Sequence, residues 1–280
     1  TYRGNLMFYL DKAWGDIDYH LNRIREMACV TGFGNDMLKM NGVKVTYDGN
    51  TSSGTSLMRK PYEHMPETSG YSTITHEELT KVCRLAAELN WQVGIHNTGD
   101  LAADQTIASI NEAYKVKKND ARHYIIHLCV FDYDQVPLLA KHNIPVASQP
   151  SINWLCGEQI TIGQDLSDRY MPAGTLLRGG VIVGGSTDCP VVSCNPFHGF
   201  YGAITREAAD GKIYNPDDRI SAKDALIMWT KSSAYFSHDE DKMGSVEVGN
   251  FADYVLLDRD ILVVPSKDII DTKVIKTKVN

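Results

Sequence analysis

Short apolar runs alternate with longer amphipathic segments along most of the chain. Apolar runs of this length, bounded by turn-forming residues, are typical of buried strands. They predict strands over 6–10, 42–47, 92–96, 123–130, 143–150 and 181–188. Between them, apolar residues recur at helical spacing. This spacing predicts helices over 16–31, 75–90, 100–117, 132–142 and 221–235, with a loop and a helix over 166–180.

The alternation of strands with helices indicates right-handed βαβ units and a parallel sheet. One helix start is explicit, because Thr75 can cap the helix and Glu78 completes a capping box. The segments 244–258 and 273–279 look like β-structure outside this series. The region 49–72 is a long loop rich in Ser, Thr, Gly and Pro, and a loop of that kind is usually functional or mobile. The predicted fold is α/β with a parallel sheet, and the length of the chain would fit a single α/β barrel.

Composition and charge indicate a globular protein rather than a membrane, nucleic-acid-binding or disulfide-rich one. The chain has 280 residues, a formal net charge of −7 and 43% hydrophobic residues, as in ordinary soluble globular proteins. No apolar run reaches the roughly 18 residues of a membrane helix, and no basic cluster favours nucleic acid. The N-terminal sequence lacks the layout of a signal peptide. Six cysteines are too few for a disulfide scaffold, so we expect a reducing, cytoplasmic location.

Four residues with metal-binding or acid–base chemistry belong to four different predicted strands. Lys44 lies within a strand, His96 and His127 lie at or near strand ends, and Asp188 ends the last strand of the series. Because the carboxyl ends of barrel strands meet on one face, we expect these side chains within about 10 Å of each other. Imidazole and carboxylate groups suit zinc or a similar divalent cation. Each residue alone also fits a structural role, such as a core histidine, a snorkelling lysine or a turn-forming aspartate.

Seven stretches of sequence are more specific in combination than any single residue. They are GVKVTYDG (42–49), GIHNTGDLAAD (94–104), RHYIIHL (122–128), VASQP (146–150), GGSTDCPV (184–191), NPFHG (195–199) and GSVEVGNFADYVLLD (244–258). Together they resemble the amidohydrolase superfamily, and most of all its amidohydrolase-3 branch, which includes N-substituted formamide deformylases. The resemblance implies a (β/α)8 barrel beside a small β-sandwich. Residues 1–240 would hold strands three to eight of that barrel, and 241–280 the C-terminal segment of the sandwich.

The resemblance also implies a role for each candidate residue. The site of this superfamily holds one or two divalent metals, usually zinc. By position, Lys44 would be the lysine that carbon dioxide converts to a carbamate, and His96 and His127 would be metal ligands. Asp188 would be both a ligand and the general base that transfers the proton of the attacking water. The implied activity is metal-dependent hydrolysis of an amide or formamide-like C–N bond in a small molecule.

The chain departs from the family pattern in three places. It contains no His-x-His pair, which in the family binds the first metal from the first barrel strand. Ile126 stands where the family usually has a glutamate, and Thr187 stands where serine often precedes the aspartate. The chain therefore looks like a family member without its N-terminal portion, which would expose open sheet edges and favour a homo-oligomer. The alternative to an enzyme is a catalytically silent barrel that persists as a binding module or a fragment.

Weaker candidates surround these four residues. Trp154 and His198 could contact a substrate, although a core tryptophan and a solvated histidine are the simpler interpretations. Cys189 and Cys194 could be soft ligands, a redox pair or part of a pocket lining.

Two further pairs complete the set of candidates. Arg178 and Arg206 could pair with a substrate carboxylate, but we expect surface salt bridges at these helix positions. Asp100 and Asp104 are expected to hold the loop after His96 rather than to bind a metal.

Overall fold

The computed structural model describes residues 2–117, 120–156 and 164–280. The chain divides into two compact units, Arg3–Val146 and Ala147–Asn280, the second of which also includes Tyr2. Strands alternate with helices in both units, so the α/β class predicted from the sequence is confirmed. No helix among these residues combines the length and the apolar run needed to cross a membrane. The boundary predicted near residue 240 stays a prediction.

The first unit is built on a mostly parallel sheet. Its strands are hydrogen-bonded in the order β1 (Gly4–Leu10), β3 (Leu38–Thr46), β4 (Val93–Asn97) and β5 (Tyr124–His127). The short strand β2 (Phe33–Gly34) pairs antiparallel with β3. The helices that follow the strands are α1 (Ile17–Glu26), α2 (His76–Glu88), α3 (Asp100–Val116) and α4 (Val136–Lys141). Single 3₁₀ turns precede α1 and α4, at Lys12–Trp14 and Tyr133–Gln135.

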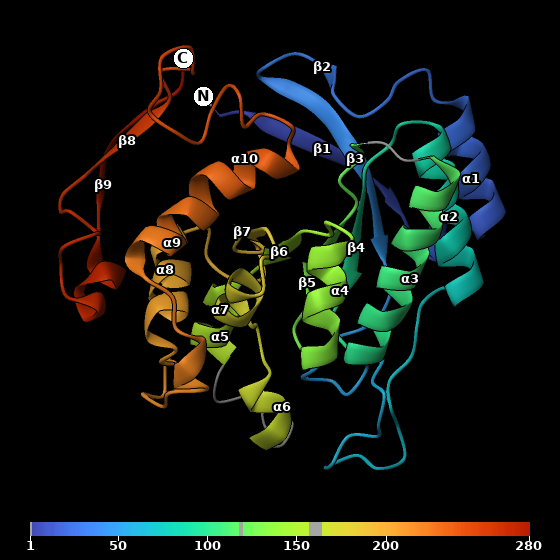
Figure 1. Ribbon diagram of the computed structural model, residues 1–280, viewed down its shortest axis with the longest axis horizontal. Coiled ribbons are helices and arrows are strands. Elements are labelled where there is room, and N and C mark those ends of the chain that lie inside the picture. The colour runs from blue at the N-terminus through green and yellow to red at the C-terminus, as the bar shows by residue number, and fades with distance from the viewer. Residues whose placement is uncertain (1, 118–119, 157–163) are drawn as a thin grey trace. The chain divides into compact units, whose positions relative to one another are not determined.

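The two faces of this sheet differ in burial. Val43, Val45, Val93, Ile95 and Ile125 are at most 2% exposed. They share the face along which α1, α2 and α3 lie (Figure 1). On the opposite face, Lys44, Thr46, His96 and Ile126 are only half buried, while Gly94 and Tyr124 are buried. We call these the helix-covered face and the open face of the sheet.

Local signals account for the ends of α2 and α1. The Thr75 side chain accepts a hydrogen bond from the Glu78 N–H, and the Glu78 carboxylate accepts one from the Thr75 N–H, so the predicted capping box is confirmed. The Asp16 side chain accepts from the Tyr19 N–H at the start of α1. These contacts satisfy amide groups that a helix start leaves without a partner.

The long loop over 49–72 is a packed structure. Met58 and Tyr62 are at most 3% exposed, and the Tyr62 hydroxyl donates to the Ser56 carbonyl at 2.9 Å. The Ser56 hydroxyl in turn lies 2.6 Å from that of Thr98, which follows β4. The loop therefore packs against the next strand-to-helix connection, as compact functional loops do.

The second unit has shorter and less regular elements. It contains most of β6 (Val146–Ser148), then β7 (Val183–Gly185) and the antiparallel pair β8 (Tyr254–Leu257) and β9 (Val274–Lys278). Its helices are α5 (Pro150–Cys156), α6 (Gln164–Asp168), α7 (Ala173–Arg178), α8 (Pro196–Thr205), α9 (Ala222–Ile227) and α10 (Ser233–Phe236). A π-helical segment over Met228–Ser232 joins α9 to α10, and 3₁₀ turns occur at Pro216–Asp218 and Ser266–Asp271. The helices α5 and α8 were not expected from the sequence.

The position of Arg206 differs from the surface salt bridge that the sequence predicted. Instead of forming a surface salt bridge Arg206 is 1% exposed, and its backbone is left-handed (φ 59°) just after α8. Its guanidinium donates to the carbonyls of Tyr170, Met171 and Tyr214 at 2.8–3.0 Å. Burial lowers the pKa of this guanidinium. Arg206 is therefore a structural cross-link, and Arg178, whose guanidinium donates to the Asp217 carbonyl, lies on the surface as expected.

Candidate active site

The first unit brings His96 and His127 into direct contact. His96 is the second-last residue of β4, and His127 is the last residue of β5. Their ring centroids are 4.6 Å apart, with the ring planes at 74° in an edge-to-face arrangement. His127 is 6% exposed and the His96 side chain 18%, so the pair is largely shielded from water.

This contact depends on an unusual backbone at His127. The register of β4 and β5 pairs His96 with Ile126, so a regular strand would place His127 on the opposite face of the sheet. His127 instead has φ 81° and Leu128 has φ 53°, conformations that side-chain-bearing residues seldom adopt. Strain of this kind persists only where the surrounding structure imposes it, and it is frequent at functional sites.

Asp48, which directly follows the predicted strand 42–47, is a buried carboxylate beside His96. It is fully buried and accepts hydrogen bonds from the N–H groups of Leu57, Thr98 and Gly99 and from the Thr98 hydroxyl, all at 2.8–3.1 Å. Its Oδ1 also lies 3.3 Å from His96 Nδ1, although this pair is not aligned as a hydrogen bond. Asp48 fixes the connection that follows β4 and provides a negative charge next to His96.

Lys44 lies on the open face, together with His96. Lys44 pairs in register with Gly94 and Thr46 with His96, so the lysine is one strand over from His96 and two residues nearer the strand start. The residue is half buried. The topology thus brings Lys44, His96 and His127 to three neighbouring strands, and their predicted common site stays a prediction.

Asp188 belongs to the second unit, three residues beyond the end of β7. Its backbone is left-handed (φ 61°), and its carbonyl accepts from the Val191 N–H at 2.8 Å, so it also forms a turn. Its predicted convergence with the three residues of the first unit stays a prediction.

The first unit contains some of the side chains that a metal ion would need as ligands. Within the described ranges, no group of three or more His, Cys, Asp or Glu side chains is placed to hold one. Two imidazoles are nevertheless adjacent, and the buried Nδ1 atom of His96 makes no hydrogen bond. Imidazole nitrogen is a preferred zinc donor, and an unsatisfied buried ring nitrogen is costly unless something binds it. The pair His96 and His127 therefore fits a metal, and the remaining ligands have to come from other groups.

Asp100 and Asp104 have the loop-holding contacts that the sequence predicted. Asp100 accepts from the Arg59 N–H at 2.8 Å, and Asp104 accepts two hydrogen bonds from the Arg59 guanidinium, both at 2.7 Å. These bonds join the 49–72 loop to the start of α3. The hydrogen bonds with Asp104 raise the pKa of the Arg59 guanidinium above its usual range.

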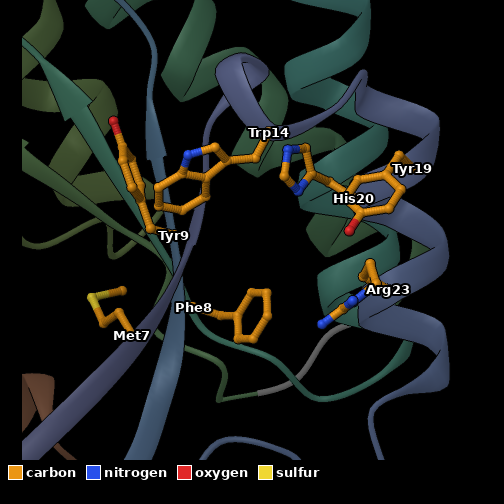
Figure 2. Close-up of a pocket in the computed structure, with 7 residues that line it drawn as sticks. All are labelled: Met7, Phe8, Tyr9, Trp14, Tyr19, His20 and Arg23. Carbon is orange, nitrogen blue, oxygen red and sulfur yellow. The ribbon is translucent and has the colours of Figure 1, made fainter.

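A cavity of about 320 Å³ lies between β1 and α1 (Figure 2). It is lined by Met7, Phe8, Tyr9, Trp14, Tyr19, His20 and Arg23, and by none of the predicted site residues. Figure 2 shows Tyr9 and Trp14 next to each other, with ring centroids 5.9 Å apart. The Tyr9 hydroxyl lies 3.0 Å from that of Thr46 on the open face, while neither His96 nor His127 lines this cavity.

In the second unit, Trp154 and His198 lie against each other. Their ring centroids are 4.6 Å apart at an angle of 36°, and the helices that carry them, α5 and α8, pack together. Cys189 and Cys194 are exposed free thiols, so they form no disulfide. Cys83 and Cys129 are buried thiols as expected, while Cys29 is only partly buried.

Comparison with known proteins gives a consistent result. Residues 14–280 match the model of the Amidohydrolase family, in its Amidohydro_3 branch. The chain is 25% identical over 251 residues to the Bacillus subtilis protein named amidohydrolase YtcJ, covering 87% of this chain and 46% of that protein. It is 23% identical over 214 residues to the N-substituted formamide deformylase of Arthrobacter pascens, covering 75% and 40%.

A solved crystal structure is also similar to this chain. The crystal structure of an uncharacterized metal-dependent hydrolase from Pyrococcus horikoshii superposes with a TM-score of 0.76 at 27% identity, covering 89% of this chain and 50% of that one. The chain thus spans about half or less of the length of these relatives. Both the incomplete barrel fold and the resemblance seen in the sequence are confirmed, and the chain belongs to the Amidohydrolase family.

Proposed function

We propose that this chain carries part of the site of a metal-dependent hydrolase that cleaves a C–N bond in a small amide or formamide. The observation that supports this most is the shielded pair of imidazoles, His96 and His127, on the face that also holds Lys44. Family membership supports hydrolysis, and the relative from Pyrococcus horikoshii is described as metal-dependent. The formamide deformylase of Arthrobacter pascens supports the choice of bond.

In this proposal His96 and His127 hold a divalent metal, most simply zinc, through ring nitrogens. In an active form of the protein Lys44 would join them as a carbamate, because an ammonium group cannot ligate a cation and a carbamate can. When bound, the metal would supply Lewis acidity and lower the pKa of water. Asp48 holds the backbone at Thr98 and Gly99, and so keeps the end of β4 in place.

Asp188 is the proposed ligand and proton shuttle. It would accept the proton of the attacking water and deliver it to the leaving amine, a role worth about 10²–10⁴-fold in rate. Trp154 and His198 would form a wall of the substrate pocket, since their rings lie against each other and aromatic side chains commonly line such pockets. We expect Asp188→Asn to reduce turnover by this factor in any active form of the protein.

A second candidate function is a silent barrel that binds without hydrolysing. It is favoured by the absence of a three-residue His, Cys, Asp or Glu cluster from the part of the chain that the structure describes. The lack of His-x-His in the sequence points the same way. We therefore expect partial metal occupancy, an unmodified Lys44 and little hydrolysis from this chain alone.

Zinc uptake by the purified chain tests the proposal. After dialysis against Zn²⁺ and removal of free ions, the wild type should retain metal, while His96→Ala and His127→Ala should not. The matched control is His76→Ala, because His76 is an exposed histidine at the start of α2. No uptake by the wild type, or equal uptake by all four proteins, would contradict the proposed metal site. Two fully bound metals with a carboxylated Lys44 would contradict the expectation of partial occupancy.

A further inference from the structure

Arg59 lies at the junction of three segments that follow three consecutive strands. Its own segment is the loop after β3. Its Nε and Nη2 donate to Asp104 in α3, which follows β4, both at 2.7 Å. Its Nη1 donates to Asp132 at 3.0 Å and its Nη2 to Asp134 at 3.1 Å, and both of these residues follow β5. Lys44, His96 and His127 lie on these same three strands.

Further hydrogen bonds connect the segment around Arg59 with the residues that follow His96. Asp100 Oδ1 accepts the Arg59 N–H, and the Leu57 carbonyl accepts the Ala102 N–H at 3.1 Å. Gly99 allows this approach, because a Cβ atom there would lie only 2.1 Å from the Leu57 carbonyl oxygen. Asp48 then binds the N–H groups on both sides of the contact, at Leu57 and Gly99, beside His96.

Gln135 reinforces the same junction from the β5 side. Its amide donates to the Asp100 carbonyl at 2.6 Å and to Asp104 Oδ1 at 2.7 Å. Asp104 is thus shared by Arg59 and Gln135. A planar guanidinium with several fixed donors suits such a junction, since a lysine would present one point charge.

We propose that Arg59 is a positioning residue: it clasps the segments after β3, β4 and β5 together and thereby fixes the backbone that carries His96 and His127. Its relevance to catalysis rests on the proposed function, while the clasp itself does not. An ordinary surface ion pair links two side chains and contributes little. Arg59 differs because its side chain is only 29% exposed and it binds three carboxylates from two other segments.

Amide hydrogen exchange tests the clasp directly. In Arg59→Gln, exchange at the amides of Leu57, Arg59 and Gly99 should accelerate roughly tenfold or more, with little change in the strands. Arg59→Lys should recover only part of the protection. Raising the salt concentration from about 0.05 M to about 0.5 M should weaken protection in the wild type more than in Arg59→Gln. Gly99→Ala, which separates the segments sterically, should produce the same local pattern without removing a charge.

Lys115→Gln is the matched control, because it removes a cation whose ion pair with Glu112 stays within α3. Unchanged exchange in Arg59→Gln, or an acceleration spread evenly over the whole first unit, would overturn the proposal.

Binding of Co²⁺ to the same variants distinguishes the proposed metal site from the proposed role of Arg59. If the wild type binds Co²⁺, Arg59→Gln should bind it about 10–100-fold more weakly, and equal affinity would overturn the positioning role. If the wild type does not bind Co²⁺, the proposed function fails and exchange alone decides on the clasp.

Discussion

The two faces of the sheet in the first unit differ in burial and in chemistry. The helix-covered face consists of aliphatic side chains, and Val43, Val93, Ile95 and Ile125 have no exposed surface. The open face carries Lys44 and His96, which remain half buried. Because successive residues of a strand point to opposite sides, one strand can place aliphatic side chains on one face and Lys44 or His96 on the other. The comparison suggests that one face provides stability while the other remains available for chemistry.

The largest effect should come from the helix-covered face. We expect Ile95→Ala to lower the free energy of unfolding by about 2–5 kcal/mol, because it leaves a cavity in a fully buried position. The neighbouring open-face variant Thr46→Ala should cost less than about 1 kcal/mol. Chemical denaturation of both variants measures the difference, and equal losses would abolish the distinction between the faces.

A histidine on the helix-covered face should make folding sensitive to pH. His123 is fully buried, accepts a hydrogen bond from the Val93 N–H and stacks on Tyr114 of α3. Burial lowers its pKa from 6.5 to about 4. The unfolded chain therefore binds this proton at a higher pH than the folded chain does. Stability should fall by about 3 kcal/mol as the pH drops from about 6.5 to about 4.

The variant His123→Gln isolates this contribution. Its unfolding free energy should change less over the same pH interval, while the exposed His76→Gln should retain the wild-type dependence. Parallel pH profiles in all three proteins would show that His123 does not titrate as its burial implies.

Asp48 lies at the carboxyl end of the open face, so its substitution measures how much this end of the sheet contributes to stability. Asp48→Asn should cost about 1–3 kcal/mol, since one amide nitrogen cannot accept the bonds now made by Leu57, Thr98 and Gly99. The loss should appear both in thermal unfolding and in the exchange of those three amides. A neutral result would mean that this carboxylate serves the site without contributing to stability.

The smallest effect on stability is expected at Lys44. Lys44→Met should change the free energy of unfolding by less than about 1 kcal/mol, because the half-buried stem keeps its packing. Zinc uptake should nevertheless fall if the lysine is a ligand. A large loss of stability would place Lys44 among the structural residues, contrary to the comparison.

Much of the first unit could be predicted from the sequence, because its information is local. Apolar runs gave the approximate positions of β1, β3, β4 and β5, and Thr75 with Glu78 fixed the start of α2. The helix α8 also had a readable start, since Asn195 caps it and Pro196 occupies its first position. The start of α8 is therefore encoded locally, like that of α2.

Other features depend on contacts that no local pattern encodes. Asp48 precedes a glycine, as turn formers do, and only the packing of the 49–72 loop makes it a buried acceptor. The helix position of Arg206 predicts a surface salt bridge, whereas the carbonyls of Tyr170, Met171 and Tyr214 hold its guanidinium inside. The left-handed backbone of His127 likewise has no sequence signal, so the strand was predicted to continue to residue 130.

The backbone at His127 implies a trade-off between foldability and function. At φ 81° a glycine would be free of the strain that a histidine bears, a difference of about 1 kcal/mol or more. A selection for thermal robustness alone would therefore favour His127→Gly, while a selection for the imidazole pair would resist it. Stabilising this protein by design should leave that position unchanged and seek its gains on the helix-covered face.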